Sequence, residues 1–330
     1  MKQRQAEFEL LRIISMMMVL LVHADGAALG LPHPDGNIVG MTCRDVWQLA
    51  VESFAIIGVN CFTMISGYFG IRLRVSGVMS FLFQCVFYSV GICIAVYAVK
   101  PELFSWTGLA ESCMVLTHTD LWYIPAYFGL MLLSPLLNAG AELMPRRAFL
   151  WTVGGFTLFN IWCGWWWQGT FNPTGYTLVQ LIMMYLIGRA VALYLPECGA
   201  KRPVILYAVS LAAVFVSAIY MEPLRAFAYN SPAVMAATVS FFLIFRSMKF
   251  ESHTVCTLAK SAFAVYLIHK APPVWGGVMK PAVISLWHNL NLTEFSIAIT
   301  AGISTLYILC CCADSVRRFI YRKLTERILP

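Results

Sequence analysis

Charged residues are scarce in this sequence: they make up 12% of the 330 residues, whereas a soluble domain usually contains about 25%. No polar stretch is long enough to form a separate soluble domain. Apolar runs of membrane-spanning length instead recur from end to end, and they are continuous rather than alternating, which favours helices over a β-barrel. We therefore expect an all-α polytopic membrane protein in which residues 1–330 form a single integral-membrane domain, a bundle of helices.

The sequence also lacks the cysteine spacings of a metal site. Its eleven cysteines form no Cys-x-x-Cys pair and no zinc pattern, so we expect no bound metal. Most lie within apolar runs, where cysteine behaves as a small buried hydrophobic residue. The run Cys310–Cys312 could be acylated, although we favour plain packing. No internal repeat is visible, and the inverted repeat of many transporters is therefore not visible either.

The apolar runs predict ten transmembrane helices. Several prolines, Pro101, Pro145 and Pro203 among them, lie between runs and punctuate the pattern. The predicted spans cover residues 9–30, 47–69, 78–99, 121–138, 149–167, 175–195, 204–221, 232–247, 256–279 and 296–316.

Basic residues are distributed unequally between alternate connecting segments. With the N-terminus in the cytoplasm, 18 of the 23 basic residues fall on the cytoplasmic side, as the positive-inside rule requires. This asymmetry supports an even number of spans with both termini in the cytoplasm.

A cleaved signal peptide is the alternative interpretation of the N-terminus. Lys2 and Arg4, a short apolar core and the small residues at 24–28 fit that pattern. Cleavage would remove Arg12 and His23 and leave nine spans, which agrees poorly with the charge distribution. We therefore favour an uncleaved first span.

The first predicted span carries an arginine at its start and a histidine eleven residues later. An α-helix turns by 100° per residue, so the side chains of Arg12 and His23 are only about 20° apart around the axis and roughly 16 Å apart along it. Both look out of one face of the helix, separated by about half the thickness of the hydrocarbon core. A helix that only anchors the chain has no use for this arrangement.

With this topology, the polar residues of the spans fall into two layers. Arg12 and Ser66 lie at the cytoplasmic level. Ionisable groups at the centre of a bilayer cost at least ~2.5–3.5 kcal/mol each, so they usually have a function. The outer layer contains His23, Glu52, Asp120, Trp122, Tyr123, Tyr266 and His269.

Each of these residues also has a purely structural interpretation. Arg12 could pair with Glu9 at i,i+3 or extend to the interface. His23 could be a hydrogen-bonded histidine of the bundle, and Glu52 could pair with Arg44 or with His269. Interfacial aromatic residues would account for Trp122, Tyr123 and the run Trp165–Trp167.

Several stretches together resemble the acyltransferase-3 family of integral-membrane acyltransferases, and the resemblance covers nearly the whole chain. The matching patterns are Arg-x10-His at Arg12 and His23, Phe-x-x-x-Ser-Gly-Tyr at 62–68, Leu-Trp-Tyr at 121–123, Leu-Ser-Pro-Leu-Leu at 133–137, Tyr-Leu-Ile-His at 266–269 and, more weakly, Leu-Ile-Gly-Arg ending at Arg189.

The resemblance implies a ten-helix core and transfer of an acyl group, usually acetyl from acetyl-CoA, to a hydroxyl of a carbohydrate or lipid-linked glycan. It implies a protein of the bacterial inner membrane with acyl-CoA, a glycan acceptor and membrane lipid as partners, and no nucleic acid. Some members carry an additional soluble domain, and others transfer succinyl groups or modify other acceptors. The acyl group and the acceptor therefore stay open.

Within that resemblance, Arg12, Arg72 and Arg74 would hold the CoA phosphates by charge-assisted hydrogen bonds, with Ser66 as a CoA contact or a packing residue. The roughly 16 Å between Arg12 and His23 is comparable to an extended pantetheine arm. The acceptor would be positioned by Trp122, Tyr123, Tyr266 and His269.

His23 would act either as the general base or as a nucleophile that carries the acyl group. Glu52 would fix its tautomer; Asp25 is less favoured because it points about 200° away from His23 on a regular helix. A transporter or flippase is the main alternative, because intramembrane ionisable groups also form substrate paths. A non-catalytic bundle that assembles glycan machinery is a third possibility.

Overall fold

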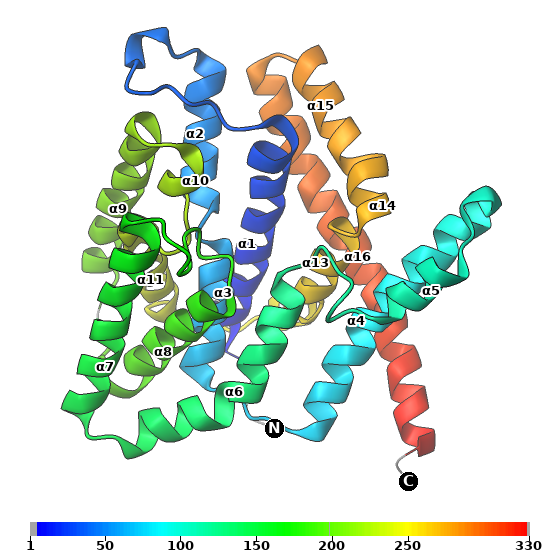
Figure 1. Ribbon diagram of the computed structural model, residues 1–330, viewed down its shortest axis with the longest axis horizontal. Helices are drawn as coiled ribbons and strands as arrows, with labels where there is room; N and C mark the ends of the chain where they lie inside the picture. The colour runs from blue at the N-terminus through cyan, green and yellow to red at the C-terminus, as the bar shows by residue number, and fades with distance from the viewer. Residues whose placement is uncertain (1–4, 198, 329–330) are drawn as a thin grey trace. The chain divides into compact units, whose positions relative to one another are not determined.

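The computed structural model describes residues 5–197 and 199–328, with side chains described as far as Leu324 (Figure 1). Within these ranges the chain forms helices and connecting loops and contains no β-strand, as predicted. Lys2 and Arg4, on which the signal-peptide interpretation depends, lie outside the described residues.

Six helical stretches in the described ranges are long and apolar enough to cross a membrane, and each coincides with a predicted span. Two shorter apolar helices, Leu178–Tyr194 and Pro232–Arg246, coincide with two more. The chain is therefore a multi-pass membrane protein, and the total of ten spans stays a prediction. The six stretches are Ala6–Ala27, Cys43–Phe69, Val75–Val99, Tyr123–Leu143, Lys201–Tyr220 and Leu292–Leu324.

The chain divides into two compact units, Met1–Leu73 with Ala126–Cys256, and Arg74–Pro125 with Thr257–Pro330. This division does not test the prediction that residues 1–330 form a single integral-membrane domain. The first unit contains α1 (Ala6–Val22), α2 (Cys43–Ala55), α3 (Gly58–Phe69), most of α6 (Tyr123–Leu143), α7 (Arg146–Phe159), α8 (Leu178–Tyr194), α9 (Lys201–Tyr220), α10 (Pro223–Ala226) and α11 (Pro232–Arg246).

Helix α3 is the centre of the first unit, because it packs on α1, α8 and α11. Its glycines allow the backbones to approach closely. A Cβ on Gly58 would lie 2.7 Å from the Ser15 carbonyl oxygen of α1, and a Cβ on Gly67 would overlap the Tyr185 carbonyl of α8. Small residues at helix crossings are the usual means of close packing in membrane bundles. The Ser-Gly-Tyr pattern at 66–68 thus has a packing role.

The Leu-Ser-Pro-Leu-Leu pattern also has a structural explanation. Pro135 lies inside α6 and has no N–H with which to bond the Met131 carbonyl one turn earlier. The Ser134 hydroxyl donates a hydrogen bond to that carbonyl at 2.8 Å. The serine therefore satisfies the carbonyl that the proline leaves without its backbone partner.

The second unit contains α4 (Val75–Val99), α5 (Trp106–Cys113), α13 (Ala262–His269), α14 (Pro272–Val274), α15 (Lys280–Asn289) and α16 (Leu292–Ile328); α12 (His253–Leu258) crosses the division between the units. The predicted span 256–279 is wrong as one continuous helix. It is interrupted by a 3-10 turn at Ala259–Ser261, by a break before Pro272 and by a π-helical turn at Trp275–Met279. Pro272 and Pro273 lack the N–H groups that a continuous helix needs.

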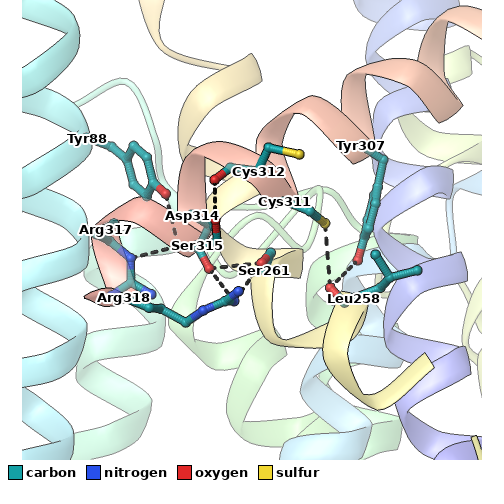
Figure 2. A network of polar contacts seen from close by, with 10 residues as sticks. All are labelled: Tyr88, Leu258, Ser261, Tyr307, Cys311, Cys312, Asp314, Ser315, Arg317 and Arg318. Carbon is teal, nitrogen blue, oxygen red and sulfur yellow. Dashed lines mark hydrogen bonds and ion pairs between the residues drawn. The ribbon is translucent and has the colours of Figure 1, made fainter. Parts of the chain in front are cut away.

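A buried aspartate on α16 organises the 3-10 turn (Figure 2). Asp314 has no solvent exposure, and its carboxylate accepts hydrogen bonds from Tyr88 at 2.9 Å, Ser261 at 2.9 Å, Arg317 at 2.7 Å and Arg318 at 2.7 Å. These contacts join α4, the 3-10 turn and α16. Sequence reasoning missed this network, because Tyr88 and Ser261 lie 226 and 53 residues away from Asp314 in the chain.

Replacement of Gly67 by alanine is expected to lower the stability of the protein, because the new Cβ would overlap the backbone of α8. Overpacking usually costs about 1–3 kcal/mol. Gly140→Ala is the matched control, since Gly140 lies in α6 with nothing within 4 Å of an added Cβ. Thermal unfolding in detergent should show a lower midpoint for Gly67→Ala only. Equal midpoints would contradict the close crossing of α3 and α8.

Removal of the Asp314 carboxylate is expected to be strongly destabilising, because it leaves Arg317 buried without its ion-pair partner. Breaking a buried ion pair from one side typically costs about 3–5 kcal/mol. Thermal unfolding of Asp314→Ala can be compared with Ser315→Ala, since Ser315 is exposed on the same helix. A midpoint for Asp314→Ala that matches the control would show that this network does not support the fold.

Candidate active site

Helix α1 carries Arg12 and leads directly to His23. It is a regular α-helix from Ala6 to Val22, so the axial separation of roughly 16 Å applies. At His23 the helix changes to a π-helical segment, His23–Ala27. Such segments are rare and are frequent at functional sites. The side chain of His23 is partly exposed.

Asp25, which belongs to the π-helical segment, lies in the same buried region as Glu52 of α2. The two residues are 2% and 3% exposed, and their carboxyl groups are close enough to interact electrostatically. Asp25 Oδ1 accepts a hydrogen bond from Gln48 at 2.8 Å. The segment after His23 is π-helical and not α-helical, and the preference for Glu52 over Asp25 as the partner of His23 stays a prediction.

Both carboxyl groups retain hydrogen-bonding capacity. Asp25 Oδ2 and Glu52 Oε2 are buried and have no hydrogen-bond partner among the residues that the structure describes. Glu52 also makes a backbone hydrogen bond with Gly26, in the middle of the π-helical segment. An added Cβ on Gly26 would lie 3.4 Å from Glu52 Oε1. Glu52 is therefore held directly against the segment that begins at His23.

Beyond Glu52 lies a buried network of amide side chains that sequence reasoning missed. Tyr176 is an electrostatic neighbour of Glu52, and its ring lies 4.6 Å from that of Tyr229. The Tyr229 carbonyl accepts hydrogen bonds from Asn60 at 2.9 Å and from Gln180 at 2.8 Å. The network continues through Asn160, Asn172, Thr177 and Asn230. Its sequence signal is a set of amides inside otherwise apolar runs.

The residues predicted for the cytoplasmic layer lie apart from this polar region. Arg12 donates to Glu9 at 2.6 Å, so the predicted i,i+3 ion pair is present. Ser66 donates within α3 to the Phe62 carbonyl at 3.1 Å and lies 3.4 Å from the Tyr127 hydroxyl. Their assignment to CoA stays a prediction.

Arg72 and Arg74 are both exposed and follow the end of α3. Arg74 is the N-cap residue of α4, where unpaired backbone N–H groups favour anions. A phosphate-binding role therefore fits their position, and it stays a prediction.

The four residues predicted to position the acceptor form one group in the second unit. The ring of Tyr123 lies 5.8 Å from that of Trp122 and 5.8 Å from that of Tyr266, and the Tyr266 ring lies 6.0 Å from His269. The fully buried His269 has Nδ1 2.7 Å from the Val265 carbonyl oxygen. Because a carbonyl can only accept, Nδ1 is the donor, and in the neutral ring Nε2 is the basic nitrogen.

These residues include the kinds of group that acid–base chemistry uses. An imidazole that shares a short helical segment with one buried carboxyl group, with a second held against that segment, resembles the pairings that orient a general base. Trp122 and Tyr123 are partly exposed, so their rings offer a surface for a hydroxylated ligand, whereas Tyr266 and His269 are buried. The predicted catalytic residues thus lie in the first unit and the predicted acceptor residues in the second. The residues predicted to bind CoA belong to neither of these groups.

Comparison with known families agrees with these features. A family model described as an acyltransferase domain matches residues 5–313, a range that contains every candidate residue discussed above. Searches of curated proteins and of solved structures gave no significant match. Because the family model covers most of the chain and the chain is a multi-pass membrane protein, the protein belongs to the acyltransferase-3 family of membrane acyltransferases.

Proposed function

We propose that the protein moves an acyl group, most simply acetyl, from cytoplasmic acyl-CoA to a hydroxyl of a glycan or lipid-linked saccharide. Family membership supports acyl transfer in general. The observation that carries the finer proposal is the uninterrupted α-helix between Arg12 and the π-helical turn at His23. Its length of roughly 16 Å matches an extended pantetheine arm. The nucleotide would remain at the Arg12 end while the thioester reaches His23.

The reaction needs one proton acceptor and one proton donor. The acceptor hydroxyl loses its proton to His23 as its oxygen attacks the thioester carbon, the carbon–sulfur bond breaks, and the thiolate receives the proton. Alternatively, His23 attacks the thioester first and carries the acyl group as an acyl-imidazole to the hydroxyl. In both routes the products are the ester and free CoA, and no other reactant is required.

Two carboxyl groups support His23 in this proposal. Glu52 remains the favoured partner because it is hydrogen-bonded to Gly26 within the segment that begins at His23. Asp25 joins it, because the two carboxyl groups are neighbours. A negative charge beside the imidazole stabilises the imidazolium that forms when the hydroxyl proton is taken. Their roles are to orient the ring and to stabilise its charged form.

We assign binding of the acceptor to the group of Trp122, Tyr123, Tyr266 and His269 in the second unit. Tyr123 and Tyr266 pack edge to face, and aromatic faces stack well on sugar rings. His269 would hydrogen-bond an acceptor hydroxyl through Nε2. In this proposal the acceptor approaches from the outer face of the bacterial inner membrane, and both termini lie in the cytoplasm.

Replacement of His23 by alanine is expected to abolish acetyl transfer while CoA binding is retained. General acid–base groups typically contribute about 10²–10⁴-fold, so we expect a loss of at least about 10²-fold in the slow hydrolysis of acetyl-CoA by the purified protein without acceptor. His33→Ala is the matched control, because His33 is an exposed histidine in the loop beyond the first span.

The same experiment separates an enzyme from a transporter. A carrier would neither bind nor consume acetyl-CoA. Unchanged hydrolysis in His23→Ala would contradict the assignment of His23, and absence of hydrolysis and of CoA binding in the unmodified protein would favour the transporter.

Replacement of Arg12 by glutamine is expected to weaken CoA binding, because a phosphate contact is lost. Arg12 also neutralises the buried Glu9, so the single variant leaves a carboxylate without this partner. The double variant Glu9→Gln/Arg12→Gln removes that complication. Calorimetric titration with CoA should show about tenfold weaker binding or more for both variants. Wild-type affinity in the double variant would show that Arg12 acts only as the partner of Glu9.

A further inference from the structure

Arg246 is a buried arginine whose hydrogen bonds are incomplete. It is the last residue of α11 and is 7% exposed. One terminal nitrogen donates to the Leu195 carbonyl at 2.6 Å, and the guanidinium carbon lies 5.8 Å from the centre of the Tyr68 ring. Nε and the other terminal nitrogen, Nη1, are buried and have no partner among the described residues.

The other arginines close to this level of burial have carboxylate partners. Arg189 pairs with Glu142 at 2.7 Å, and Arg317 pairs with Asp314 at 2.7 Å. Within the part of the chain that the structure describes, Arg246 makes no such ion pair. A buried charge without a counter-charge is expensive. The carbonyl ends of α8 and α11 attract a cation, but they leave two of the three guanidinium nitrogens without an acceptor.

Arg246 lies at the same end of the first unit as the start of α1. The Tyr68 ring, which faces Arg246, lies 4.9 Å from Phe8 and 5.4 Å from Phe242. Phe8 is one helical turn before Arg12 on the same face of α1. Arg12, however, is already neutralised by Glu9. Of the two arginines, Arg246 is therefore the one that offers an unbalanced charge.

We propose that Arg246 binds a phosphate group, and that this phosphate belongs to the nucleotide half of acyl-CoA. The assignment of the source rests on the proposed function, whereas the need for an anion rests on Arg246 alone. Phosphate fits because guanidinium N–H groups form short, charge-assisted hydrogen bonds to its oxygens. An anionic lipid headgroup presents the same chemistry, and the experiment distinguishes the two sources.

The test compares ligands that differ only in phosphate. CoA and phosphate-free pantetheine are titrated into the full-length protein in detergent, with Arg246→Gln, Arg246→Lys and the exposed control Arg202→Gln. We expect Arg246→Gln to bind CoA about tenfold more weakly or worse, Arg246→Lys to recover part of the affinity, and pantetheine binding to stay unchanged. Inorganic pyrophosphate should compete with CoA in the unmodified protein and in Arg202→Gln.

A second measurement tests whether an anionic lipid headgroup supplies the phosphate. It also provides a result if Arg246→Gln folds too poorly for titration. Thermal unfolding of the unmodified protein, of Arg246→Gln and of Arg246→Lys is compared in nanodiscs of phosphatidylglycerol and of phosphatidylcholine. Stabilisation by phosphatidylglycerol that Arg246→Gln removes, with CoA affinity unchanged, would keep the phosphate site but overturn its assignment to CoA. If Arg246→Gln weakens the binding of CoA and of pantetheine equally, Arg246 has a structural role only. If neither CoA binding nor stabilisation by phosphatidylglycerol changes in the Arg246 variants, the proposal is overturned.

The outcomes also separate this inference from the proposed function. If the unmodified protein binds no CoA, the proposed function fails, and the nanodisc comparison alone decides whether Arg246 binds phosphate. If the protein binds CoA and loses nothing in Arg246→Gln, the inference fails while the proposed function stands.

Discussion

The structure depends on one constraint: an ionisable or polar group among apolar helices must find its partner inside the protein, because lipid offers none. Most such groups obey it. Asp314 saturates its carboxylate with four donors, and the amides around Asn60 and Gln180 bond one another. Among the buried atoms without a partner in the described residues are one oxygen each of Asp25 and Glu52 and two guanidinium nitrogens of Arg246. We place the chemistry at these exceptions, because a group retained at such a cost usually has a function.

Packing keeps these exceptions in position. Close contacts at Gly58 and Gly67 fix α3 against α1 and α8, and α1 carries Arg12 and ends at the π-helical turn of His23. Rigid helices position reacting groups more accurately than loops do. Asp25, in that π-helical turn, lies within electrostatic reach of the buried Glu52 of α2. Fold and site are thus linked through the same few glycines and one irregular turn.

Composition and hydrophobic runs predicted the helical membrane fold and most helix positions, because long apolar stretches have few alternatives. They did not predict the 3-10 turn within the span 256–279, because the partners of Ser261 and Leu258 lie on α16, about fifty residues away. The break at Pro272 had a signal in the two prolines, which was overlooked. Spacing identified Arg12 and His23 on one helix. It did not show that Asp25 and Glu52 lie in one buried region, because these residues belong to different helical elements. Nothing in the sequence distinguishes Arg246 from other basic residues at helix ends, since its burial is visible only in three dimensions.

The central claim of the proposal is that acyl-CoA donates its acyl group from the membrane face that bears the N-terminus, and that the acceptor receives it at the opposite face. The most direct measurement uses sealed proteoliposomes of defined orientation, with radiolabelled acetyl-CoA only at the face that bears the N-terminus and a membrane glycan extract only at the opposite face. The account predicts acetyl label on glycan hydroxyls at the opposite face, with free CoA remaining on the side of addition. Label found only when both reactants share one face would contradict it.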